Sequence, residues 1–268
     1  SKYATNYSGN VILVSHPRQS YSALVSLFSS EEAYASSEQI HCSAQIEATA
    51  HLGKQCTVGA HSTIAKEARL GFEVHIGRCC TIGAGVHIGD KSIIGDNVTI
   101  HSGVKLGAQC HIESGCVLGA RPFNSLKQKG AWQNCQSLGG LIIGSFVVVG
   151  ANATISRGAL GDTFIAENVQ IDNLVHIAHD VTIGAHTAIA GCAAIGAFAQ
   201  IGQHCIIGGA SCINANVILS DDIVITGMST VNKSIKKAGI YSSGTLVSEH
   251  QLWRRNASRF KHLDHYAQ

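Results

Sequence analysis

The stretch Ile171-Asp-Asn-Leu-Val-His-Ile-Ala-His-Asp180, followed by Val181-Thr-Ile-Gly184, decides the fold of this chain. A branched apolar residue stands at every sixth position, and a small or β-branched residue follows each one four places later. A period of six fits neither the 3.6-residue turn of a helix nor the two-residue alternation of a strand. A fixed short period is typical of repeat proteins, and hexapeptide repeats predict a parallel β-helix with three short strands in each coil.

The same spacing extends over most of the chain. It runs unbroken from Ile40 to Leu118, resumes at Ile143 and continues to Val231, with a short interruption at 161–164. The apolar residues are predicted to point inward and to stack on their equivalents in neighbouring coils. A glycine commonly follows the apolar residue, where the backbone must pass close to another segment or adopt a positive φ. The register breaks at 119–141, which predicts a loop extruded from the coil, and such loops are common recognition elements.

The composition suits a stacked coil and excludes several other classes. Charged residues make up 13% of the chain, against roughly a quarter in ordinary domains, and there are 29 glycines but only 2 prolines. The net charge of +2 argues neither for nor against nucleic acid as a partner. No run of about 18 apolar residues occurs, so we expect no membrane span.

The ten cysteines are interpreted as reduced thiols. Five occupy the small-residue position of the hexad, where a free cysteine behaves as a small buried hydrophobe. No C-x-x-C pair occurs, so we expect neither a zinc cluster nor a disulfide framework, and we expect a cytoplasmic protein. The five are Cys56, Cys80, Cys110, Cys116 and Cys205.

Three regions are predicted, in a fold dominated by β-structure. Residues 1–38 form a truncated N-terminal α/β segment with a strand at 10–14, an amphipathic helix at 21–28 and a polar linker. The β-helix occupies residues 39–237. Residues 238–268 form a cap followed by a helix over 248–268.

His179 is the candidate for chemistry. It is the one histidine at the third position of a hexad, a corner position, whereas an isolated surface histidine in a coil is ordinarily a solvated side chain. Metal-dependent hydration is not expected, because carbonic anhydrases of this architecture use two histidines five residues apart and no pair here has that spacing. No metal site is predicted.

Four segments closely resemble the UDP-3-O-acylglucosamine N-acyltransferases of lipid A biosynthesis, a lipopolysaccharide pathway. They are the segments 150–163, 171–180, 207–211 and 241–244. The resemblance implies a left-handed parallel β-helix and a homotrimer with active sites between subunits. It also implies transfer of a 3-hydroxyacyl chain from the phosphopantetheine thioester of acyl carrier protein to the 2-amine of a UDP-linked 3-O-acylglucosamine, with no further cofactor.

The resemblance assigns roles to individual residues. His179 matches the general base, which must take a proton from the sugar ammonium before its nitrogen attacks the thioester. Asp172 and Asn173 match a dipeptide one hexad earlier, and we expect Asp172 to orient His179. The backbone N–H groups of Gly196 and Ala197, one coil further on, are expected to stabilise the oxyanion.

Binding roles follow in the same way. Tyr3 matches an aromatic residue that stacks on uracil, although it could equally be an ordinary tyrosine. Asn216 stands where the family has a second histidine and is assigned to the substrate. A basic cluster would suit the acidic acyl carrier protein, although a solvated helix face explains it equally well. The cluster comprises Lys233, Arg254, Arg255 and Arg259.

The chain also departs from the family pattern. Arg121-Pro-Phe-Asn124 replaces a usual Asp-Gly-Phe-Gly, and Ser156 replaces a usual aspartate. Two alternatives therefore remain. One is an acetyl-CoA-dependent N-acetyltransferase acting on another UDP-linked amino sugar, and the other is a diverged, weakly active paralogue.

Overall fold

The computed structural model describes residues 9, 12–17, 20, 21, 24, 25, 40–244, 248–260 and 263. The chain divides into two compact units, residues 1–39 and residues 40–268. The second unit therefore includes residues 238–268 together with the coil.

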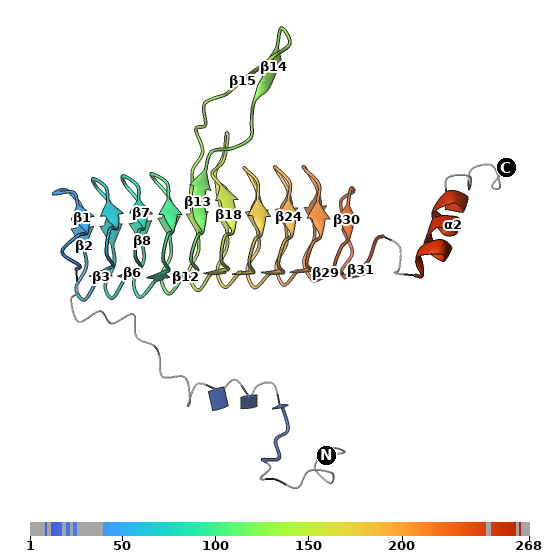
Figure 1. The fold of residues 1–268 in the computed structure, drawn as a ribbon, viewed down its shortest axis with the longest axis horizontal. Coiled ribbons are helices and arrows are strands. Elements are labelled where there is room, and N and C mark those ends of the chain that lie inside the picture. Colours follow the sequence, from blue (N-terminus) through green and yellow to red (C-terminus); the bar gives the residue numbers. More distant parts are fainter. Residues whose placement is uncertain are drawn as a thin grey trace. The chain divides into compact units, whose positions relative to one another are not determined.

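The second unit contains a parallel β-helix made of three sheets whose strands stack coil on coil (Figure 1). The first sheet consists of β1 (Gln45–Ile46), β4 (Thr63–Ile64), β7 (Thr81–Ile82), β10 (Thr99–Ile100), β13 (Val117–Ala120), β18 (Thr154–Ser156), β21 (His176–Ile177), β24 (Ala194–Ile195), β27 (Cys212–Ile213) and β30 (Thr230–Val231). The second sheet consists of β2 (His51–Leu52), β5 (Arg69–Leu70), β8 (His87–Ile88), β11 (Lys105–Leu106), β16 (Leu141–Ile143), β19 (Thr163–Ile165), β22 (Thr182–Ile183), β25 (Gln200–Ile201) and β28 (Ile218–Leu219). The third sheet consists of β3 (Thr57–Val58), β6 (His75–Ile76), β9 (Ile93–Ile94), β12 (His111–Ile112), β17 (Val148–Val149), β20 (Gln170–Ile171), β23 (Ala188–Ile189), β26 (Ile206–Ile207), β29 (Ile223–Ile225) and β31 (Gly239–Tyr241).

The hexad explains this arrangement. Most strands end on the apolar first residue of a hexad, which faces the core, while the residue before it faces outward, as in His176–Ile177. Equivalent residues pair across coils, so that Ile46 lies beside Ile64 and Ile64 beside Ile82. The register survives the extruded loop because Leu106 pairs with Ile143. The predicted parallel β-helix is confirmed.

Two backbone features shape the corners of the coil. The fourth residue of the hexad commonly adopts a left-handed conformation even when it is not glycine, as in Asp180 with φ 56°. The glycine at the second position serves a close approach instead. A Cβ on Gly107 would lie 2.5 Å from the nitrogen of Ser145 and 2.7 Å from the oxygen of Gly144. A side chain at Gly107 would therefore force the backbone of the neighbouring coil to shift.

The cysteine prediction is confirmed for the small-residue position. Cys56, Cys80, Cys110, Cys116 and Cys205 are all buried and unpaired. Burial raises the pKa of the Cys116 thiol to about 11. These thiols contribute packing rather than reactivity.

The ends of the chain differ in part from expectation. The predicted strand at 10–14 is wrong for its described part, because Ile12, Leu13 and Val14 are exposed and belong to no strand. Residues 17, 20, 21, 24 and 25 are helical. The predicted C-terminal helix is confirmed as α2 (His250–Phe260), which buries none of its side chains.

One element was not foreseen. The extruded loop contains an antiparallel hairpin of β14 (Leu126–Gln128) and β15 (Ala131–Gln133), which projects from the coil (Figure 1). Among the described residues, no helix has the length and apolar character needed to span a membrane.

Candidate active site

His179 lies at the corner between the first and second sheets, directly after β21. Its side chain is only 9% exposed. Its Nδ1 lies 2.7 Å from Oδ2 of Asp180, and the Phe198 ring meets it edge-on, with ring centroids 5.2 Å apart. Two neighbours therefore fix the orientation of the imidazole.

Asp180 is held as a carboxylate by an irregular segment of the preceding coil. Its side chain accepts hydrogen bonds from the backbone N–H groups of Ala159, Leu160 and Gly161 at 2.7, 3.2 and 2.8 Å. Burial raises the pKa of this carboxyl, but the hydrogen bonds from Ala159, His179 and its other donors outweigh burial and hold the pKa below its ordinary value.

The charge of Asp180 selects the tautomer of His179. A carboxylate can only accept, so Nδ1 of His179 carries the hydrogen and donates it to Asp180. The lone pair of the neutral ring is then on Nε2. A buried, oriented imidazole with a free Nε2 is equipped to act as a general base.

The expectation that Asp172 orients His179 is wrong within one chain. Asp172 lies at a different corner, between the third and first sheets, because it follows β20 rather than β21. Its carboxylate accepts from the backbone N–H groups of Asn173 at 2.7 Å and Gly191 at 2.9 Å. Asn173 in turn accepts from the N–H of Ala151 at 2.7 Å. The carboxylate that acts on His179 is the residue next to it, Asp180, which sequence reasoning did not select.

A cavity of about 380 Å³ opens beside His179. It is lined on the coil side by Gly196 and Ala197 and on the loop side by Arg121 and Phe123. Three of the predicted catalytic and substrate residues thus lie at one cavity together with two loop residues. In the sequence, the segment Arg121-Pro-Phe-Asn124 stood out only because it departs from the family pattern. That departure was the available sign that the loop contributes to the cavity.

Gly196 is excluded as an oxyanion donor. Its N–H already donates to the carbonyl of Ile213 at 2.8 Å, as the N–H of Ala178 does to Ile195 at 2.9 Å. The N–H of a second hexad residue is therefore part of the ladder between coils. The N–H of Ala197, by contrast, has no hydrogen-bond partner within the described part of the chain. Ala197 is the available donor one coil beyond His179.

The remaining predicted residues are not brought to this cavity. Asn216 is exposed at a fourth hexad position with φ 61°, and Asn214 lines the cavity instead. Lys233 is exposed on the same corner as His179, three coils further on. Arg254, Arg255 and Arg259 are exposed on α2. Tyr3 lies outside the described residues.

Over the ranges that the structure describes, no group of three or more His, Cys, Asp or Glu side chains is arranged to hold an ion. The site therefore consists of an oriented histidine beside a cavity where the backbone N–H of Ala197 is available as a donor.

A three-sheet coil of hexapeptide repeats with a buried histidine at a corner is typical of the hexapeptide-repeat transferases. Models of the bacterial transferase hexapeptide (six repeats) match residues 73–108, 91–121 and 162–197, and the hexapeptide repeat of succinyl-transferase matches residues 50–89. The UDP-3-O-acylglucosamine N-acyltransferase of Pseudomonas syringae pv. tomato is 37% identical over 98% of this chain and 75% of its own. The corresponding protein of Coxiella burnetii is 38% identical over 99% of this chain and 78% of its own. The chain belongs to the UDP-3-O-acylglucosamine N-acyltransferase family and is an acyltransferase.

Solved structures agree on the fold. The crystal structure of a UDP-N-acetylglucosamine O-acyltransferase from Moraxella catarrhalis aligns with a TM-score of 0.60 and 26% identity, over 82% of this chain and 78% of the other. That protein is named as an O-acyltransferase, so the coil itself does not fix the acceptor atom.

Proposed function

We propose that this protein transfers a 3-hydroxyacyl chain from acyl carrier protein to the 2-amine of UDP-3-O-acylglucosamine in lipid A biosynthesis. The single observation that carries the proposal is the buried His179–Asp180 pair at the edge of a cavity. Membership of the family supplies the substrate class. A cytoplasmic location is part of the proposal.

The reaction needs one proton carrier and one charge stabiliser. Nε2 of His179 removes a proton from the sugar ammonium, and the freed amine attacks the thioester carbonyl. The imidazolium is stabilised by Asp180, and the N–H of Ala197 donates to the oxyanion that forms. When the intermediate collapses, the C–S bond breaks and the proton on the imidazolium passes to the leaving thiolate. As the amide forms, the attacking nitrogen loses its second proton to solvent. The products are therefore an amide, a free thiol and one released proton.

The assembly is proposed to be a trimer with its cleft between copies. Asp172 and Asn173 lie at another corner from His179, so they can take part in the same site only as residues of a neighbouring copy. The exposed side chains of Lys233, Arg254, Arg255 and Arg259 are proposed to attract the acidic carrier protein.

Release of free thiol tests the reaction. Wild-type protein should release thiol from 3-hydroxyacyl carrier protein when UDP-3-O-acylglucosamine is present, and His179→Ala should lower the rate by a factor of about 10² or more. His186→Ala, an exposed histidine at another corner, is the matched control and should keep the wild-type rate. Both variants should retain the wild-type mass in solution, three times the chain mass of 28.1 kDa.

The same assay separates the rival function. Faster thiol release from acetyl-CoA than from the carrier protein would identify an acetyltransferase and overturn the proposed donor. The loop residue Arg121 at the cavity is the observation that favours an altered substrate. A near-normal rate in His179→Ala would remove this histidine from the mechanism.

A further inference from the structure

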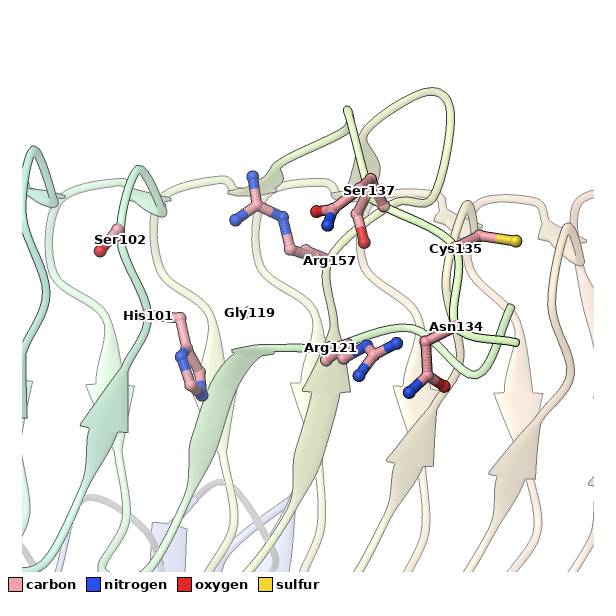
Figure 2. Close-up of a pocket in the computed structure, with 9 residues that line it drawn as sticks. His101, Ser102, Gly119, Arg121, Asn134, Cys135, Ser137 and Arg157 are labelled. Atoms are coloured by element: carbon pink, nitrogen blue, oxygen red, sulfur yellow. The ribbon is translucent and has the colours of Figure 1, made fainter. Parts of the chain in front are cut away.

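A second cavity, of about 490 Å³, lies on the same corner as His179. It is lined by His101, Arg121 and Arg157 and by polar residues of the extruded loop. Figure 2 shows the two arginine side chains between His101 on one side and loop residues Asn134 and Cys135 on the other. Arg121 lines this cavity and also the one beside His179, so the two cavities adjoin.

The coil fixes how close these residues are to the catalytic base. Arg157 and His179 are both third hexad residues after strands of the first sheet, and those strands, β18 and β21, pair directly. Paired strands lie about 4.8 Å apart. The backbone of Arg157 is therefore one coil from His179. Ala120 lies one coil before Arg157, because the N–H of Arg157 donates to the carbonyl of Ala120 at 2.9 Å. Arg121 follows Ala120, so the extruded loop starts one coil before Arg157.

The charges in the second cavity are all positive or neutral. Its lining contains no aspartate or glutamate, and within the described residues neither arginine takes part in an ion pair. Nε of Arg157 donates to the carbonyl of Gly139 at 2.7 Å, which fixes one edge of the guanidinium. Its two terminal nitrogens have no hydrogen-bond partner among those residues. Two cations on adjacent coils repel each other unless an anion lies between them.

We propose that this cavity binds a phosphate or diphosphate group of a substrate. A guanidinium presents paired donors whose spacing matches phosphate oxygens, and serine and amide side chains complete the polar lining. A ligand that places its phosphate here extends past Arg121 to the cavity of His179. The proposal deepens the proposed function and rests on it for the identity of the ligand, which is either the diphosphate of the nucleotide-linked sugar or the phosphate ester of the donor's pantetheine arm.

Calorimetric titration of the full chain with inorganic pyrophosphate, UDP and coenzyme A tests this site. Arg157→Gln and Arg121→Gln should each weaken pyrophosphate binding about tenfold or more, and added salt should weaken wild-type binding. Arg69→Gln changes an exposed arginine on the second sheet and should leave affinity unchanged. If the variants lose affinity for UDP but not for coenzyme A, the site takes the acceptor's diphosphate, and the reverse result identifies the donor arm.

Unchanged affinities in both variants, or no pyrophosphate binding by wild-type protein, would overturn the proposal. Arg121 makes no side-chain hydrogen bond within the described residues, so Arg121→Gln remains informative if Arg157→Gln fails to fold. Binding is measured without turnover, which separates the two claims. A chain that binds pyrophosphate through these arginines but releases no thiol would refute the proposed function alone. A chain that is active but has unchanged binding in the variants would refute only the phosphate site.

Discussion

The Asp180 carboxylate stabilises the fold through its hydrogen bonds and orients His179. Replacing Asp180 with asparagine tests these two roles separately. The side chain of Asp180 is 7% exposed and receives four hydrogen bonds, three from backbone N–H groups and one from His179. Asparagine has the same size but only one acceptor oxygen, and its NH₂ group would face donors. If that oxygen serves two of the four donors, two bonds to a charged group are lost.

The magnitude follows from that count. A hydrogen bond to a charged group contributes about 1.5 kcal/mol or more, so we expect Asp180→Asn to lower the free energy of unfolding by about 3 kcal/mol. The rate of acyl transfer should fall about 10²-fold or more, because an amide no longer fixes the hydrogen on Nδ1 of His179. Urea unfolding gives the first quantity, and thiol release by the folded variant gives the second.

The pH dependence of stability supplies an independent check. The pKa of Asp180 in the folded state is lowered from 3.8, so its contribution is fully present above that ordinary value. The contribution is lost as the pH falls below 3.8 and through the folded-state pKa. Asp180→Asn should therefore lose part of the acid sensitivity of wild-type protein.

Asp221→Asn is the matched control. Asp221 accepts one backbone hydrogen bond, from Gln203 at 2.7 Å, at an exposed position. This change should cost no more than about 1 kcal/mol and leave the rate unchanged. A folded Asp180→Asn variant within about twofold of the wild-type rate would refute the assignment of Asp180 as the residue that orients the base.

Two further predictions concern the coil. Gly107→Ala should lower the free energy of unfolding by about 1–3 kcal/mol, because its Cβ would meet backbone atoms of Gly144 and Ser145. Gly85→Ala has open space around it but a φ of 65°, so it should cost about 1 kcal/mol. Equal urea midpoints for the two variants would contradict the close-approach explanation. In a thiol-reagent titration at pH 8, the exposed Cys42, Cys79 and Cys192 should react before Cys116, whose pKa is raised to about 11 by burial, and rapid reaction of all ten cysteines in the folded protein would show that the core is open.

The sequence predicted the fold well because the determinants of a β-helix are local and repeated. Each hexad places one apolar residue in the core and one small residue at a corner, and each coil repeats the pattern of the last. The positions of Ile177 and His179 within their hexad were thus enough to place one in the core and the other at a corner.

What the sequence could not supply was the pairing of side chains across coils where the repeat is interrupted. Regular partners are 18 residues apart, but Asp180 holds Ala159 and Gly161 at separations of 21 and 19 residues, because extra residues at 157–162 disturb the count. A period read from the sequence assumes that the count is uniform. It therefore did not identify the contacts between Asp180 and the interrupted segment. The orienting role was assigned to Asp172 on the resemblance, and Asp172 lies at another corner.

The sequence by itself determined the coil, its corners and the one coil histidine at the third position of a hexad, because these depend on spacing along the chain. Only the tertiary structure decided which carboxylate holds His179, that the N–H of Gly196 is already bonded, and that Arg121 and Arg157 share a cavity. Those facts depend on which coils are neighbours and on where the extruded loop returns to the coil. A six-residue spacing specifies neither of these.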